Sequence, residues 1–327
     1  DFNHDPVDHS LFLDEEHKIL KNQIKRFVDE KVKPNGVDWE KNGFIPREIF
    51  LEMGKLGFLG ITYPSEYGGS AMDSRGSVIL AEELGRSTFS GFAIATLVHT
   101  DMASVHLLNA GNQDQKEKYL REIIKGNKIS CVAVTEPSTG SDVKNISTKA
   151  KQVGDKYYLN GSKIFITNGG SADLIIVAAK TDQTVGAKGI SLILLDTNNA
   201  EGFSRGKPLK KLGLKGNDTA ELFFDNVKVP LTNLIGKEEG QGFYQMMNQL
   251  PWERLLIGIT ALGAIDFGLQ ETIKYVQDRK AFGKRIMDLQ NTRFKLAEAK
   301  TKAEVLRSFI NDCISRLIKG QLDAATA

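Results

Sequence analysis

The sequence predicts an α+β protein in which a helical segment, a β-rich segment and a second helical segment follow one another. Two changes of period predict this order. Apolar residues repeat with helical spacing up to about residue 128, then with strand spacing, and return to helical spacing near residue 240. We therefore expect an N-terminal helical domain over 1–128, a β-barrel-like domain over 129–236, and an incomplete C-terminal helical bundle over 237–327.

The first segment is predicted to be all-helical. Apolar residues at positions 20, 24, 27 and 28 lie on one face of a helix over 10–32, and Pro34 is expected to end it. Further helices are expected over 47–57, 76–85, 92–110 and 113–125. Asn112 is placed to cap the last of them at its N-terminus, and Gly111 and Gly126 stand where C-terminal caps belong.

The middle segment is rich in Val, Ile, Tyr and Phe, with strands expected over 129–134, 172–179, 189–195 and 220–229. The stretch 157–166 is predicted to form two strands joined at Asn160-Gly161, since Asn-Gly favours a two-residue hairpin turn. After residue 240, helices are expected over 242–249, 252–277 and 287–318. Another is expected to begin at Leu322 and to be cut off near its start.

Composition excludes several classes of protein. The 327 residues carry 43 Lys and Arg against 41 Asp and Glu, so the net charge of +2 favours neither nucleic acid nor an anionic membrane surface. No apolar run is long enough to span a membrane, and no signal pattern begins the chain. The two cysteines indicate a reducing compartment, and the five histidines show no metal-ligand spacing, so no metal is expected.

The stretch from Leu250 to Ile257 contains the candidate catalytic base, Glu253. Local chemistry offers an alternative explanation, because Pro251 at a first helical position and an acid in the first turn also make an ordinary helix start.

Three other segments are also ambiguous when considered singly. The hydroxyl-rich loop at 134–142 could present backbone N–H groups to a phosphate or a ring edge, or could be a polar turn. Phe165 ends a strand and could stack on a cofactor or belong to the core. The basic cluster at 278–285 could clamp a pyrophosphate or be a solvated loop.

Taken together and in order, these segments resemble the acyl-CoA dehydrogenase family of flavoenzymes over the whole chain. The motifs that carry the resemblance are Thr135-Glu136-Pro137 with Gly140-Ser141-Asp142, Leu159 to Gly169, and Arg279 to Gly283 with Gln290. Around Glu253 the sequence is most similar to the long-chain branch, and next to the isovaleryl-CoA branch. In both branches the base lies at this glutamate. The departures are Ser138-Thr139, where relatives often have Gly-Ala, and Phe165, where several have Trp.

The resemblance implies FAD as cofactor. It implies that the segment from Val132 to Ser141 holds the flavin, with Val134 and Thr135 facing the ring, and that Phe165 and Thr167 flank the ring from the other side. Gly140 and Phe282 belong to the same cofactor site, and Arg279 and Gln290 touch the FAD of a neighbouring subunit in a homotetramer. The acyl-CoA would be bound by Ser141, Phe243, Tyr244, Pro251 and Arg254.

The implied reaction is dehydrogenation of a medium- to long-chain acyl-CoA to its trans-2-enoyl-CoA. Glu253 would take the α-proton while the β-hydride passes to flavin N5, and the electrons would leave to an electron-transfer flavoprotein. The expected location is the mitochondrial matrix or a bacterial cytoplasm. The alternatives are a branched short-chain dehydrogenase, an acyl-CoA oxidase, and an inert assembly partner with the same fold.

Overall fold

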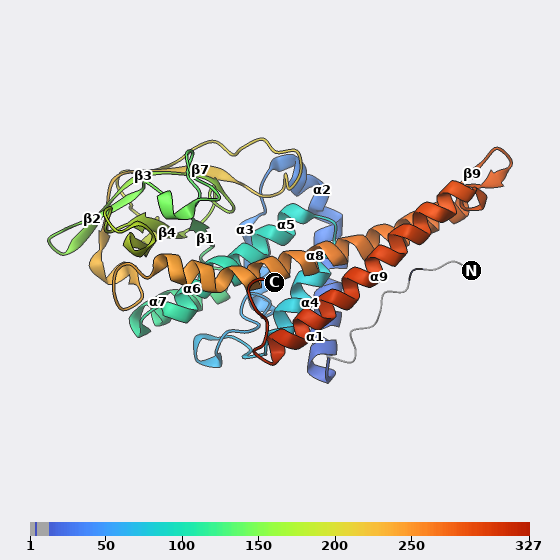
Figure 1. Cartoon of the computed structure of the whole chain (residues 1–327), viewed down its shortest axis with the longest axis horizontal. Helices are drawn as coiled ribbons and strands as arrows, with labels where there is room; N and C mark the ends of the chain where they lie inside the picture. Colours follow the sequence, from blue (N-terminus) through green and yellow to red (C-terminus); the bar gives the residue numbers. More distant parts are fainter. Residues whose placement is uncertain (1–3, 5–12) are drawn as a thin grey trace. The chain divides into compact units, whose positions relative to one another are not determined.

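The computed structural model describes residue 4 and residues 13–327 (Figure 1), and the chain forms two compact units. Within the described residues, one unit consists of residue 4 with 13–35, 73–93 and 251–327, and the other consists of 36–72 and 94–250. The β-rich segment and the helices next to it in sequence therefore fold as one body, here called the sheet unit. The first and last helical segments form the other body, here called the helical unit.

Helices make up most of the described chain before residue 125 and after residue 241, as the sequence predicts. The helical elements are α1 (Glu15–Phe27), η2 (Val28–Val32), α2 (Lys33–Asn42), α3 (Arg47–Lys55), η3 (Ser65–Tyr67), α4 (Arg75–Arg86), α5 (Ser90–Leu97), η4 (Val98–Ala103), α6 (Ser104–Ala110), α7 (Gln113–Ile124), η5 (Val143–Asn145), η6 (Gly186–Gly189), η7 (Leu231–Asn233), α8 (Gly242–Asp278), η8 (Ile286–Asp288) and α9 (Gln290–Ile318).

The strands lie mainly between α7 and α8. They are β1 (Ser130–Ala133), β2 (Lys149–Val153), β3 (Lys156–Ile166), β4 (Leu174–Lys180), β5 (Ile190–Asp196), β6 (Phe203–Arg205), β7 (Ala220–Pro230) and β8 (Leu234–Ile235), with the short pair β9 (Lys280–Ala281) and β10 (Lys284–Arg285) between α8 and α9.

The sheet of the sheet unit has the strand order β6-β7-β3-β2-β4-β5-β8, and β1 pairs with β4 in parallel. This architecture confirms the predicted fold class. The barrel-like form is the part that differs, because no pairing closes β6 onto β8 within the described residues. Strands β4 and β5 are antiparallel, in register from Leu174–Asp196 to Lys180–Ile190, and their apolar side chains are buried on both faces, which gives the sheet its covered centre.

The predicted hairpin at Asn160-Gly161 is wrong. Both residues lie inside β3, where the register against β7 shifts between Leu159 and Gly161, and Gly161 has a φ of +148°. The extra residue lies on β7, where Asp225 and Asn226 face Asn160 alone and Asn226 has a φ of +52°, so Asn160-Gly161 continues the strand opposite a β-bulge and does not reverse the chain. The reversal occurs at Gly154-Asp155 instead, where Val153 pairs with Lys156 and Gly154 has a φ of +62°.

Two predicted helix boundaries are also wrong. Pro34 does not end the first helix, because the π-helical turn η2 (Val28–Val32) leads directly into α2, with the proline in its first turn. No helix begins at Leu322, since residues 321–327 form turn and irregular structure. The start expected at Ser10 lies outside the described residues. By contrast, the predicted cap at Asn112 is confirmed, with a reciprocal capping box to Gln115.

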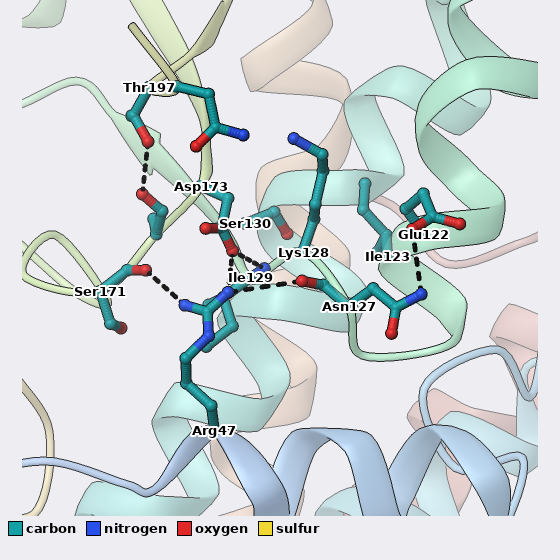
Figure 2. A network of polar contacts seen from close by, with 12 residues as sticks. Arg47, Glu122, Ile123, Asn127, Lys128, Ile129, Ser130, Ser171, Asp173 and Thr197 are labelled. Atoms are coloured by element: carbon teal, nitrogen blue, oxygen red, sulfur yellow. Dashed lines mark hydrogen bonds and ion pairs between the residues drawn. The ribbon is translucent and has the colours of Figure 1, made fainter.

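Within the sheet unit, α3 is tied to the sheet through the guanidinium of Arg47 (Figure 2). It forms an ion pair with Asp173 and donates hydrogen bonds to the Ser171 carbonyl at 3.1 Å and the Asn127 carbonyl at 3.4 Å. The same Asp173 carboxylate accepts a hydrogen bond from the Ile129 N–H at 2.8 Å. Arg47 therefore fixes the start of β4 and the entry to β1, which is the strand that leads into the candidate site.

Two helical stretches, Ser90–Ala110 and Gly242–Asp278, have the length and apolarity of a membrane span. Most of the apolar window of the first is buried within the protein, as in the core helix of a globular domain.

Candidate functional site

The loop that follows β1 is anchored by a buried ion pair between Glu136 and Lys163 of β3. Their charged atoms lie 2.8 Å apart, and the side chains are 1% and 0% exposed. The Glu136 carboxylate also accepts hydrogen bonds from Ser147 and Thr148. Burial acts to raise the pKa of Glu136, but the Lys163 charge and these hydrogen bonds outweigh it and bring the pKa to about 2. The loop and the strand thus form one rigid element.

The sequence alone does not identify this pair as part of the site, because Glu136 and Lys163 occur in it only as members of the motifs at 135–137 and 159–169. The signal that could have identified them is the alternation of β3, which directs Lys163 to the same buried face as Leu159. A lysine there requires a buried acid as partner.

Phe165 projects outward from the end of β3. Its side chain is 64% exposed although Lys163, two residues earlier, is fully buried, whereas a regular strand places such residues on the same face. Phe165 lies on the opposite face from Lys163 because the register shifts between Lys163 and Ile166, where Phe165 has a φ of +59°. A left-handed conformation is unusual for an aromatic residue and marks an imposed local geometry. Phe165 is therefore not packed in the core, and its ring is accessible to a ligand.

The turn after β3 holds Thr167. The next residue, Asn168, has a φ of +61° and is buried, and its side-chain amide donates to the Ala95 carbonyl at 2.9 Å and accepts from the Asn217 amide at 3.1 Å. These contacts fix the backbone on the C-terminal side of Thr167, which is half-buried beside the exposed Phe165.

The loop at 134–141 presents polar groups opposite its anchor. Thr135 is half-buried, and no residue in the described part of the chain accepts a hydrogen bond from its N–H. Gly140 and Ser141 are exposed, and a Cβ built on Gly140 would meet only the Thr135 methyl, at 3.9 Å. The site combines the unpartnered N–H of Thr135, the open space at Gly140 and the exposed ring of Phe165. This combination suits a planar ligand with hydrogen-bond acceptors on its edge. These residues therefore fit a flavin ring.

One apolar cluster joins three of the sequence-predicted residues. Val132, Val134 and Phe243 pack against the same core, which includes Leu107 and Met246. Tyr244 contacts Phe243 edge to face at 5.9 Å between ring centroids and is itself exposed. The N-terminal part of α8 thus borders the strand that enters the candidate flavin loop.

Glu253 does not lie at a helix start. Residues 242–278 form one helix of 37 residues, α8, and Pro251 lies inside it. The predicted break between 249 and 252 is therefore wrong, and the N-terminal dipole does not explain an acid at this position. Glu253 is half-buried and burial raises its pKa to about 7, opposed by the charge of the exposed Arg254. A carboxylate with a pKa near neutrality is suited to act as a general base.

The basic cluster at 278–285 forms a short hairpin at the end of α8. Strands β9 and β10 pair there, with Phe282 and Gly283 at its tip in left-handed conformations. Phe282 is 93% exposed, and Arg279 is exposed with no ion-pair partner in the described residues. Gln290 is exposed at the start of α9. All three side chains are free to contact something outside this chain.

The sequence-predicted residues are divided between the two units. The sheet unit holds Val132, Val134, Thr135, Gly140, Ser141, Phe165, Thr167, Phe243 and Tyr244, and the helical unit holds Pro251, Glu253, Arg254, Arg279, Phe282 and Gln290. In the described residues no three His, Cys, Asp or Glu side chains are grouped as metal ligands.

Three family models match the chain in succession. They are the N-terminal, middle and C-terminal domains of acyl-CoA dehydrogenase, over residues 14–127, 131–227 and 240–327. The mitochondrial long-chain specific acyl-CoA dehydrogenase of Mus musculus is 40% identical over 95% of this chain and 72% of its own length. The mitochondrial isovaleryl-CoA dehydrogenase of Pongo abelii is 35% identical over 98% and 76%.

Solved structures agree with these matches. An acyl-CoA dehydrogenase from Geobacillus kaustophilus superposes with a TM-score of 0.92 at 41% identity, covering 95% of this chain and 81% of that one. A glutaryl-CoA dehydrogenase from Mycobacterium smegmatis in complex with FADH2 gives 0.86 at 30% identity, covering 94% and 77%.

The fold and the matches define a flavin-dependent oxidoreductase. More particularly, the chain belongs to the acyl-CoA dehydrogenase family, whose members are FAD enzymes that dehydrogenate acyl-CoA thioesters. The predicted family, enzyme class and cofactor are confirmed.

Proposed function

We propose that the protein dehydrogenates medium- to long-chain acyl-CoA thioesters to trans-2-enoyl-CoA, with Glu253 as the base. The observation that carries this proposal is the burial of Glu253 in the middle of α8, which raises its pKa to about 7. Nothing in helix capping explains an acid there, and catalytic bases are tuned toward their operating pH by such burial. The long-chain enzyme of Mus musculus at 40% identity supports the substrate class.

The chain's own residues have separable tasks in this scheme. The anchored loop with Thr135 and Ser141, and the outward ring of Phe165, hold the flavin and exclude water from one face of it. Glu253 takes the α-proton of the thioester, and Arg254 moderates the rise of its pKa. FAD, when bound, supplies the acceptor for the β-hydride.

We infer that the active unit is a homotetramer in which the hairpin at 280–285 reaches the cofactor of a neighbouring copy. The exposed guanidinium of Arg279 can bind pyrophosphate in a bidentate manner. Phe282 and Gln290 are close to it in sequence and are also exposed. The proposed electron acceptor is an electron-transfer flavoprotein. The names of relatives include a mitochondrial enzyme and an acyl-CoA dehydrogenase of Bacillus subtilis, so both the matrix and a bacterial cytoplasm are consistent locations.

The test is a rate profile of the purified FAD-loaded protein across straight and branched acyl-CoAs, with an artificial electron acceptor. We expect the highest kcat/KM on straight medium to long chains. A maximum on isovaleryl-CoA would assign the branched short-chain alternative instead. Peroxide formed in step with enoyl-CoA without an added acceptor would identify an oxidase, and an absence of flavin reduction by every thioester would identify an inert member of the family.

A further inference from the structure

Lys163 makes a second contact that charge pairing with Glu136 does not require. Its ammonium donates to the carbonyl oxygen of Val134 at 2.9 Å while it lies 2.8 Å from the Glu136 carboxylate. A hydrogen bond from a cation is shorter and stronger than one from a neutral donor, and the effect is larger in a buried environment. The ammonium therefore polarises one particular peptide group, the one that joins Val134 to Thr135.

Polarisation of this peptide group also strengthens its N–H, which belongs to Thr135 and points to the opposite side of the loop. In a trans peptide the C=O and N–H point in opposite directions, and the structure has no cis peptide bond in its described residues. The Val134 carbonyl points to the buried Lys163, so the Thr135 N–H points away from it. The neighbouring Thr135 carbonyl is already held by the Ile164 N–H at 2.9 Å, which fixes the orientation of the loop.

The Thr135 N–H is a donor without a partner among the described residues, on a half-buried residue. A buried or half-buried donor is costly unless a ligand or water satisfies it. We propose that Lys163 is a positioning residue for the flavin: through the Val134–Thr135 peptide it strengthens and aims the Thr135 N–H at an electron-rich edge of the bound ring. This inference rests on the proposed flavin site at this loop.

A chemical consequence follows for the redox step. A ring that has accepted electrons carries more negative charge at its acceptor atoms, so a strengthened N–H donor stabilises the reduced flavin more than the oxidised flavin. The role of Glu136 is then to keep the lysine charged in its buried position. Burial lowers the pKa of Lys163 to about 8, and the Glu136 charge opposes that change, so the ammonium persists at neutral pH.

The test compares Lys163→Met, Glu136→Gln and the double variant, with flavin affinity, midpoint potential and melting temperature measured for each. Lys163→Met keeps an unbranched side chain that is one atom shorter and removes the ammonium, and we expect it to weaken FAD binding about tenfold. If the reduced flavin loses about tenfold more affinity than the oxidised flavin, the two-electron potential falls by about 30 mV. Lys128→Met is the control, since it removes the half-buried lysine of the Lys128–Asp196 pair in the same unit.

The set of variants distinguishes an effect of Lys163 on the bound flavin from an effect on the stability of the fold alone. Glu136→Gln removes the charge that keeps Lys163 protonated, so its potential should fall toward that of Lys163→Met, and a lower pH that protonates the lysine should bring the potential back toward the wild-type value at the same pH. The double variant removes the uncompensated carboxylate, so it should recover melting temperature relative to Lys163→Met while its potential stays low. A potential that followed melting temperature across the set, or that matched the wild type in both lysine variants, would overturn the proposal. If the wild-type protein took up no FAD, the proposed flavin site would fail together with it.

Discussion

Pro251 and Glu253 lie in the interior of one continuous helix, so the glutamate is nowhere near a helix N-terminus. The proline interrupts the backbone hydrogen bonding of α8 one half-turn before the acid. An acidic residue placed there, half-buried and with its pKa raised to about 7, has no role in capping and carries a cost of burial. The proposed role of Glu253 as the catalytic base accounts for an acid at this position.

Glu253→Gln is expected to keep FAD and lose nearly all turnover, because the amide has the shape of the carboxylate and cannot accept the α-proton. A loss of at least 10²-fold in the rate of flavin reduction is about the least expected for removing a general base. Stopped-flow reduction by an acyl-CoA measures it. Glu271→Gln, on the exposed face of the same helix, is the matched control. Reduction of the Glu253→Gln variant at the wild-type rate would remove Glu253 from the mechanism.

The pH profile should rise through the pKa of Glu253. The base must be ionised, so kcat/KM is expected to increase with pH and to reach half its limit near pH 7 in the wild type. A profile already flat between pH 5 and pH 8 would show that no group with this pKa limits the reaction.

Stability should show the opposite dependence on pH. Because the folded pKa of Glu253 is raised from 4.5 to about 7, the folded protein binds more protons than the unfolded chain between those values. The free energy of unfolding therefore falls as the pH rises through that window. Glu253→Gln removes this contribution, so its melting temperature relative to the wild type should increase from pH 5 to pH 8. A constant difference would contradict the burial of the carboxyl group.

Arg279→Ala is expected to increase FAD loss on dialysis while leaving the melting temperature of the flavin-free protein unchanged, since the side chain is exposed and has no ion pair in the described residues. Arg279→Lys should restore only part of the retention, because lysine keeps the charge and loses the bidentate fork. Lys284→Ala, on the facing strand of the hairpin, controls for the loss of positive charge. Unchanged flavin content in the alanine variant would argue against the clamp.

The helical unit contains a buried ion pair whose disruption should be costly. Arg307 and Asp266 are each 1% exposed, and His4 lies 2.9 Å from the same Asp266 carboxylate. Arg307→Met leaves a buried carboxylate with less compensation, and a loss of about 3–5 kcal/mol in unfolding free energy is expected. Arg316→Met breaks the exposed pair with Asp312 and should cost about 0–1 kcal/mol. Chemical denaturation measures the free energy of unfolding, and an equal loss in the two variants would contradict this prediction.

The sequence by itself determined the order helical, β, helical, the N-terminal helix cap at Asn112, and the family. These follow from local periodicity, capping chemistry and motif order, which are properties of neighbouring residues. The same local logic misplaced the turn at Asn160-Gly161 and the helix ends at Pro34 and Pro251, because pairing with β7 and continuation of the helix override turn and proline preferences.

Only the tertiary structure decided what surrounds each functional residue. The sequence does not show whether Glu253 lies at a helix start or inside a helix. The structure shows that it lies inside α8, where the loss of surrounding solvent raises its pKa. Likewise, Lys163 and Glu136 are 27 positions apart, and their contact depends on the packing of β3 beneath the loop. Burial and long-range pairing are properties of the folded chain, so the sequence alone could predict Glu253 as the candidate base but could not show the environment that raises its pKa.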